Sequence, residues 1–366
     1  LQKAYVHLFV AVTASLIAVT SIAAPAKTTS PLATAPLAKP VSGYNQPSKD
    51  ILDVMRAPAT PVPYVSPTQD RILLVSWQEY PTLARVATPF LKLAGARVEP
   101  KNHSKHDTPG GYGISPCAVG FDLVQIADGK RTPIALPAGT CPELPQWSPD
   151  GKRLAFANVT TESVELWVAE ANTGKAQKVN GIRLNPMLND VVQWMPDQKS
   201  LLIKMVPNGL GPAPAKPLTP VGPSIQETSG EKGQSSTYEN RDTLGSPHDE
   251  DLFDYYATSQ LALVDVMTFA VNRIGTAANF DSVDPAPDGK HVLVTAVHKP
   301  YSYVTTYDRF PHSVEVWDVS KPSKIGVHRI ADLPLADRVP IHGVPVGARD
   351  HAWRANDPAT LVWAEA

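Results

Sequence analysis

A short pattern of alternating apolar and polar residues recurs along the chain, each time divided by a tight turn. In "WSPDGKRLAF", which begins at Trp147, and in "WMPDQKSLLI", which begins at Trp194, a Pro-Asp turn leads into an apolar stretch. Alternation with a period of two is typical of half-buried strands, and an Asp-Gly pair suits a turn that needs a left-handed residue. The pattern therefore predicts antiparallel hairpins.

The hairpin pattern occurs five times. Its copies are "YVSPTQDRILLVSW", "WSPDGKRLAFANV", "WMPDQKSLLIKMV", "DPAPDGKHVLVTAV" and "WRANDPATLVWAEA". Aligned on the residue two before the proline of the turn, or its equivalent, they fall at Val65, Trp147, Trp194, Pro285 and Trp353. A second hairpin, "VELWVAEANTGKAQKV", follows the second copy and completes a set of four strands. Four short antiparallel strands in about 40 to 45 residues are the content of one propeller blade.

The repeat predicts an all-β fold, a β-propeller of four-stranded antiparallel blades. Only the interval from Trp147 to Trp194 has the length of a bare blade, so the others are expected to carry insertions in surface loops. The last segment, from Trp353 to Ala366, supplies only one hairpin. We expect residues 64–366 to form about four blades plus the first hairpin of a fifth, a propeller incomplete at its C-terminal end.

The first 26 residues, "LQKAYVHLFVAVTASLIAVTSIAAPA", have the order of a secretory signal peptide: a lysine, an uncharged apolar stretch, then small residues. The alternative is a membrane anchor, since the stretch approaches the about 20 apolar residues that span a bilayer. We expect export to the periplasm or outside the cell, and no stable membrane insertion once the signal is cleaved. Residues 27–63 are rich in Pro and Ala and predict a flexible lead-in.

The composition narrows the range of partners. The 366 residues are 43% hydrophobic and 19% charged, the balance of a folded protein, and 37 prolines favour short strands over long helices. A formal net charge of -2 leaves no basic excess to neutralise phosphates, so no nucleic-acid partner is expected.

Cys117 and Cys141 would meet an oxidising compartment after export, which predicts a disulfide; the alternative is two free buried thiols. The two cysteines lack the paired ligand spacing of a zinc site, and no metal or cofactor is expected.

Motifs for catalysis are weak. No serine lies in a G-x-S-x-G motif; "GISPC" and "GPSIQ" each lack the second glycine. In "SPHDED" we expect Ser246 to cap a short helix with the acidic residues 249–251 in its first turn, rather than to belong to a triad. "KNHSKHD" places His103 and His106 at a spacing that could share a metal on a helix, but its lysines and lack of apolar periodicity favour a solvated loop. No catalytic residue is therefore predicted.

Residues 298–319, "HKPYSYVTTYDRFPHSVEVWDV", are rich in aromatic side chains and mixed charge. Tyr301, Tyr303 and Arg309 are candidates for a surface that receives a peptide. The alternative is that the tyrosines pack between blades and that Arg309 pairs with a nearby acidic residue.

Three long stretches carry a family resemblance. They are "PLTPVGPSIQETSGEKGQSSTYENRDTLGSPHDEDLFDYYATSQL", "DPAPDGKHVLVTAVHKPYSYVTTYDRFPHSVEVWDV" and "LPLADRVPIHGVPVGARDHAWRANDPATLVWAEA". They closely resemble the N-terminal propeller of glutamyl endopeptidases, a branch of the prolyl oligopeptidase family of serine peptidases. The resemblance covers about residues 64–366 and is most specific from Pro217 onward, whereas "WSPDGK" alone is shared by many TolB-like propellers.

The resemblance implies a two-domain peptidase in which the propeller caps a C-terminal α/β-hydrolase domain and admits short peptides. The catalytic Ser, Asp and His of that domain have no counterpart here, so we expect the substrate-gating portion of an exported serine peptidase, truncated before its catalytic domain. For the parent the resemblance implies cleavage after glutamate, and Arg309 is a candidate to hold the glutamate carboxylate. The alternative is a non-catalytic TolB-like periplasmic propeller that acts as a protein-binding module.

Overall fold

The computed structural model describes residues 47–107, 113–136, 139, 141–218, 242–340 and 343–365. They fall in two compact units that divide after Ala57. The predicted signal peptide, residues 1–26, and most of the predicted lead-in lie outside the described residues. The first unit holds helix α1 (Lys49–Met55), which buries none of its side chains and which the sequence patterns did not predict. No helix in the described ranges is long and apolar enough to cross a membrane.

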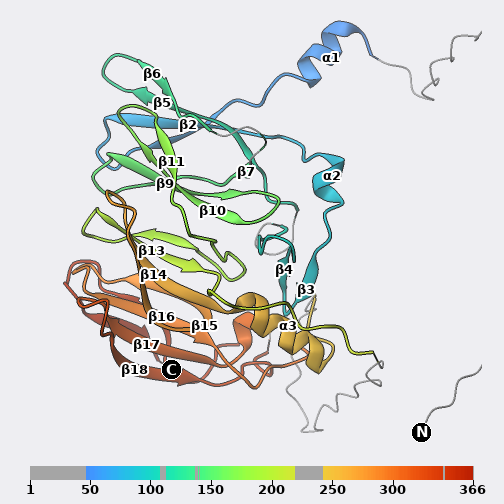
Figure 1. Cartoon of the computed structure of the whole chain (residues 1–366), viewed down its shortest axis with the longest axis vertical. Coiled ribbons are helices and arrows are strands. Elements are labelled where there is room, and N and C mark those ends of the chain that lie inside the picture. Colours follow the sequence, from blue (N-terminus) through green and yellow to red (C-terminus); the bar gives the residue numbers. More distant parts are fainter. Residues whose placement is uncertain are drawn as a thin grey trace, which may run out of the picture. The chain divides into compact units, whose positions relative to one another are not determined.

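The second unit, residues 58–366, is built from antiparallel sheets that follow one another along the chain (Figure 1). The first sheet has the order β1-β2-β5-β6, and the second has the order β11-β10-β9-β7, with β8 also paired to β9. The strands of these sheets are β1 (Val62–Val65), β2 (Arg71–Trp77), β5 (Ala118–Gln125), β6 (Arg131–Pro133), β7 (Cys141–Pro142), β8 (Gln146–Trp147), β9 (Arg153–Val159), β10 (Val164–Glu170) and β11 (Ala176–Lys178).

The third sheet contains seven strands in chain order, from β12 to β18. They are β12 (Val192–Trp194), β13 (Ser200–Met205), β14 (Ser259–Asp265), β15 (Val271–Pro285), β16 (His291–Val297), β17 (His312–Asp318) and β18 (Gly326–Leu333). Strand β15 is 15 residues long; residues 271–278 pair with β14, and residues 279–285 pair with β16. It is therefore the last strand of one set of four, β12 to β15, and the first strand of the next, β15 to β18.

Two smaller hairpins complete the strands. They are β3 (Leu91–Leu93) with β4 (Ala96–Val98), and β19 (Arg349–Trp353) with β20 (Leu361–Ala364). The remaining helices are α2 (Leu83–Val86), α3 (Pro247–Ala257) and the short 3-10 helix η1 (Tyr307–Arg309).

All five predicted hairpins are present as antiparallel pairs. In each, the residue used to align the repeat is the last residue of the first strand. The left-handed turn position is filled by glycine in two copies, Gly151 and Gly289, and by glutamine in two others, Gln69 and Gln198, all with φ between 58° and 67°. Because the antiparallel hairpins recur in four-strand sets, the predicted all-β propeller fold class is confirmed; the number of blades and the domain boundaries stay predictions.

The repeat also reproduces a contact between neighbouring sheets. Trp194 Nε1 donates to the main-chain oxygen of Gln146 at 3.1 Å, and Trp353 Nε1 donates to that of Asp284 at 2.8 Å. Each acceptor comes directly before the aligned residue of the preceding hairpin. Trp147 has the same place in its hairpin, but its buried indole nitrogen has no partner among the described residues. A tryptophan at this position thus ties one hairpin to the hairpin before it.

Side chains between the sheets form three apolar clusters. One joins β2 and β5 to β9 through residues such as Leu73, Phe121 and Phe156. A second joins β9 and β10 to β13 and β14, and a third joins β13 and β14 to β15, β16 and β17. Each sheet is thus covered by its neighbours in the sequence, as expected of blades that cannot bury both faces alone.

The insertions do more than form surface loops. Between β2 and β5, between β13 and β14, and between β16 and β17, the chain contributes residues 83–107, 242–258 and 298–311, which we name the insertion cluster. Its members share a separate apolar core that includes Leu93, Val98, Phe253, Tyr256 and Phe310. The expectation that the insertions form surface loops is therefore wrong for these segments, because the three insertions bury apolar surface against one another.

Candidate functional site

Tyr301 and Tyr303 lie between β16 and β17 and bind helix α3. The Tyr301 hydroxyl donates to the Asp254 carboxylate and accepts from the Asn279 amide at 3.0 Å. The Tyr303 hydroxyl donates to Glu250 Oε1 at 2.8 Å, and burial together with this carboxylate raises the pKa of Tyr303 to about 12. Both hydroxyls thus hold the acidic face of α3, and their contact with a substrate stays a prediction.

Helix α3 itself follows the predicted capping. The Ser246 hydroxyl accepts from the Asp249 main-chain N–H at 3.3 Å, at the start of an 11-residue helix. Lys299 Nζ lies 3.2 Å from Asp254 Oδ2 and 3.5 Å from Glu250 Oε2, which balances the acidic side chains that the tyrosines approach. The insertion with the most specific family resemblance is therefore fixed by charge and hydrogen bonds to the tyrosine-rich loop.

Arg309 closes the 3-10 helix η1. Its Nη1 donates to the main-chain oxygen of Val339 at 3.2 Å, and its own main-chain oxygen accepts from Ala336 N–H at 2.9 Å. These contacts attach Arg309 to the segment after β18. Its predicted role in holding a glutamate carboxylate stays a prediction.

The histidine segment "KNHSKHD" is not a solvated loop. His103 and His106 are each 4% exposed, and Asn102 and Ser104 are buried beside them. The sequence pattern failed here because the burial depends on tertiary contacts: Tyr255 and Tyr256 of α3 lie against His103, and Phe90 stacks on His106.

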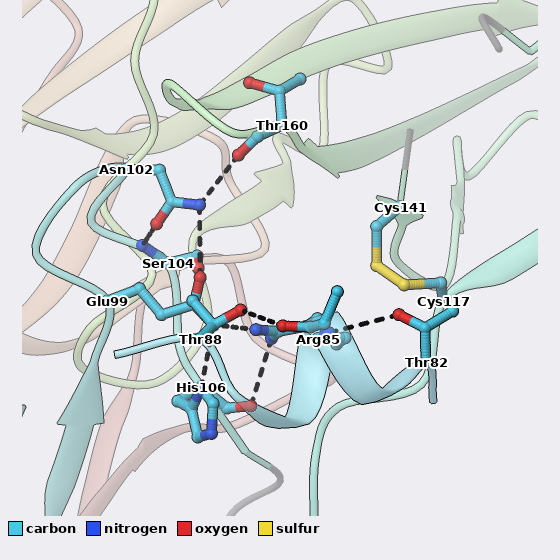
Figure 2. A network of polar contacts seen from close by, with 11 residues as sticks. Thr82, Arg85, Thr88, Glu99, Asn102, Ser104, His106, Cys117, Cys141 and Thr160 are labelled. Atoms are coloured by element: carbon cyan, nitrogen blue, oxygen red, sulfur yellow. Dashed lines mark hydrogen bonds and ion pairs between the residues drawn. A yellow bond between two sulfur atoms is a disulfide. The ribbon is translucent and has the colours of Figure 1, made fainter. Parts of the chain in front are cut away.

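A network of polar side chains holds this segment (Figure 2). Arg85 pairs with the Glu99 carboxylate, which also lies 3.0 Å from His106 Nδ1. Asn102 donates to the Thr160 main-chain oxygen at 2.8 Å, which connects the segment to the end of β9. The network satisfies several buried polar groups of the segment, whereas His103 Nδ1 and Ser104 Oγ have no partner among the described residues.

Cys117 and Cys141 are joined by a disulfide, with their Cα atoms 4.6 Å apart. Cys117 directly precedes β5 in the first sheet, and Cys141 opens β7 in the second sheet. The bond lies beside the polar network of Figure 2 and links two neighbouring sheets covalently.

A cavity of about 320 Å³, which we name the inner cavity, lies beside the first strands of the second and third sheets. Its walls come from β8, β9 and β12, from residues 186–191 and from the insertion between β2 and β5. Four of its lining side chains are ionisable: Lys105, Asp107, Glu143 and Asp190. Asp107 already accepts from Arg97 at 2.7 Å, so Lys105, Glu143 and Asp190 carry the charge that a bound molecule would meet.

Burial shifts two of these groups toward their neutral forms. It lowers the pKa of Lys105 and raises the pKa of Glu143, and the charge of each partly offsets the effect on the other. The exposed carboxylate of Asp190 lies at the same cavity. A site of this kind can bind polar or cationic groups of a peptide through short-range charge and hydrogen bonds.

A buried lysine lies behind the rim of the inner cavity. Lys204 on β13 is 0% exposed, and its ammonium donates to the main-chain oxygens of Leu188, Phe280 and Asp281. The Asp281 carboxylate accepts from Asn189, a cavity-lining residue, at 2.6 Å. Burial lowers the pKa of Lys204 to about 7 and raises that of Asp281. Asn189 thereby connects the cavity wall to Asp281, whose main-chain oxygen accepts from Lys204.

Sequence reasoning missed these residues. Only Lys204 left a detectable signal, because it interrupts the apolar run "LLIKMV", where a lysine on a buried strand needs partners. In the parts of the chain that the structure describes, no group of three or more His, Cys, Asp and Glu side chains could hold a metal ion.

Comparison with curated proteins gives two long matches. The chain is 35% identical over 346 residues to a probable chloroplastic glutamyl endopeptidase of Oryza sativa subsp. japonica, which covers 90% of this chain and 35% of that protein. It is 36% identical over 341 residues to the probable chloroplastic glutamyl endopeptidase of Arabidopsis thaliana, which covers 88% of this chain and 34% of that protein. The chain therefore spans about a third of the length of these relatives. No protein-family model matches the chain.

Comparison with solved structures gives weaker likenesses. The β-propeller domain of the Trilobed protease from Pyrococcus furiosus is 12% identical with a TM-score of 0.38, over 80% of this chain and 59% of that chain. An acylaminoacyl peptidase of Pyrococcus horikoshii is 13% identical with a TM-score of 0.40, over 76% of this chain and 33% of that chain. The long sequence matches confirm the predicted resemblance to glutamyl endopeptidases: the chain is similar to about a third of each of these two proteins.

Proposed function

We propose that this chain is the substrate-gating propeller portion of a serine peptidase whose catalytic α/β-hydrolase domain follows it. The observation that carries the proposal is the identity of 35% over 346 residues with a probable glutamyl endopeptidase. The parent would hydrolyse short peptides after glutamate, through an acyl-enzyme on the serine of the hydrolase domain. The propeller would contribute access control and part of the peptide-binding surface.

The inner cavity supports the gating role. It is lined by the exposed residue Asp190 and by Lys105 and Glu143, whose side chains can meet an extended peptide. A folded protein domain is too large to enter a cavity of about 320 Å³. Access through this cavity would therefore exclude folded substrates and admit extended peptides.

Export is the proposed location. The disulfide between Cys117 and Cys141 supports it, because disulfides persist in oxidising compartments. In that compartment the parent would meet peptides rather than nascent cytosolic chains.

The test is to express the gene read through past codon 366 and to assay the product on peptides. Glutamyl peptides of about ten residues should be cleaved, and the same sequence inside a folded domain should resist. Asp190→Asn should lower kcat/KM for peptides with a cationic residue by about fivefold, which corresponds to about 1 kcal/mol, the upper end for an exposed ion pair. Asp251→Asn, on the exposed side of α3, is the matched control and should leave kcat/KM unchanged.

Two outcomes would contradict the proposal. A stop codon soon after codon 366 would leave a non-catalytic propeller and favour the binding-module alternative. Cleavage of folded and unfolded substrates at equal rates would show that the propeller does not gate access.

A further inference from the structure

A second cavity has a volume of about 330 Å³. It is lined by His103, Arg183 and Tyr255, by the end of β13, and by residues 206–211. None of its lining residues belongs to the inner cavity. We name it the His103 cavity.

His103 presents an unsatisfied polar atom at this cavity. The residue is 4% exposed, and its Nδ1 has no hydrogen-bond partner among the described residues. The ring is held in place: it lies 5.0 Å from the ring of Tyr256 and 5.9 Å from that of Tyr255, and the main chain of His103 donates to Glu99 at 3.0 Å. A buried polar atom without a partner costs about 1 to 3 kcal/mol, so an unpaired nitrogen at a cavity suggests a ligand that satisfies it.

Arg183 gives the cavity its charge. Its side chain is exposed at the cavity, and it forms no ion pair with any described residue. No acidic residue lines the cavity within the described ranges. The guanidinium acts on His103, since burial first and the Arg183 charge second lower the pKa of His103 to about 4. At pH 7 the imidazole is therefore neutral and has one N–H to donate, and the field at the cavity is positive.

The glycine-rich wall leaves room for a ligand. Gly209 and Gly211 both adopt positive φ, at 74°, and a Cβ atom at either position would meet nothing within 4 Å. The Tyr255 hydroxyl donates to the Gly211 main-chain oxygen at 2.8 Å, which fixes this wall against α3. The lining of the cavity thus combines a glycine-containing wall, which is attached to α3, with one cationic side chain.

We propose that the His103 cavity binds a small oxyanion, a carboxylate or phosphate group, with Arg183 as its charged partner and the His103 imidazole as a hydrogen-bond donor. A guanidinium presents paired N–H donors that match the oxygens of such groups. The site is separate from the proposed peptide path through the inner cavity and does not depend on a catalytic domain.

The test is calorimetric titration of the full chain with sodium acetate and, separately, with inorganic phosphate at pH 7. Saturable 1:1 binding of either probe supports the proposal, and the stronger of the two identifies the group. Arg183→Gln should weaken that binding at least tenfold. Arg273→Gln, an exposed arginine on β15, is the matched control and should leave binding unchanged.

His103→Asn tests the second contact. Asparagine tolerates the left-handed φ of 62° at this position, so the variant keeps the backbone while it removes the imidazole. During the titration the imidazole signals of His103, assigned by their loss in this variant, should shift in NMR spectra. The proposal is overturned if neither probe binds saturably, if Arg273→Gln weakens binding as much as Arg183→Gln does, or if the His103 signals do not move.

Discussion

Replacing Lys204 by methionine should change how stability depends on pH. The Lys204 ammonium is fully buried and donates to three main-chain oxygens. Burial lowers its pKa from 10.5 to about 7, although the charge of Asp281 opposes the change. In the unfolded chain the pKa returns to about 10.5, so between pH 7 and 10.5 the unfolded chain binds the proton more firmly than the folded protein does.

The sign follows from this difference in proton binding. Because the unfolded state holds more protons in this window, the free energy of unfolding rises with pH, by up to about 1.4 kcal/mol per pH unit. With the folded pKa near 7, the contribution of Lys204 should rise by about 3 kcal/mol between pH 7 and 9.5. The Lys204→Met variant lacks this contribution.

The assay is urea unfolding of the wild type and the variant at pH 7, 8 and 9.5. The quantity compared is the difference between their free energies of unfolding, because groups that titrate alike in both proteins cancel. Lys199→Met, at an exposed lysine in the turn before β13, is the control and should show a constant difference. A Lys204 difference that stays flat within about 0.5 kcal/mol would show that the ammonium remains charged in the folded protein and would refute the reasoning.

Two further substitutions test the packing of the sheets. Cys117→Ser should lower the free energy of unfolding by about 3.5 kcal/mol in the chain-entropy model, since the bond to Cys141 closes a loop with a sequence separation of 24. Reduction of the wild type should likewise lower its urea midpoint, and an unchanged midpoint would contradict this prediction. Gly275→Ala should cost about 3 kcal/mol, because a Cβ atom at φ +64° would lie 2.3 Å from Trp317 Cζ3. Gly129→Ala is the control, because Gly129 has φ +70° and open space around it, so this change measures backbone strain alone. It should lower the free energy of unfolding by about 1 kcal/mol. Equal losses of stability at both positions would exclude the clash with Trp317.

The hairpins were predictable because their information is local. The turn chemistry and the alternation of apolar residues lie within about 14 consecutive residues, and Trp147, Trp194 and Trp353 each end a first strand as the alignment required. The cap of α3 by Ser246 is equally local, since donor and acceptor are three residues apart.

The insertion cluster and the inner cavity were not predictable in the same way. His106 is buried because Phe90 stacks on it with ring centroids 4.0 Å apart and Glu99 binds its Nδ1, and neither contact follows from the spacing of the two histidines. Lys105 and Glu143 meet at one cavity although they come from different connections, so their shifted pKa values reflect tertiary burial. A periodic pattern identifies which face of a strand is buried. It does not show which segment, distant in the chain, buries an ionisable side chain.

Strand β15 has a consequence for how the protein comes apart. The first and second sheets are separate hydrogen-bonded units, joined by loops, side chains and one disulfide. By contrast, β15 is one continuous strand that belongs to two strand sets: residues 271–278 pair with β14, and residues 279–285 pair with β16. The boundary between these two sets therefore lies within one strand, between residues 278 and 279, and not in a loop. We expect the amide protons of β12–β14 and of β16–β18 to exchange with solvent as two groups that are coupled through β15.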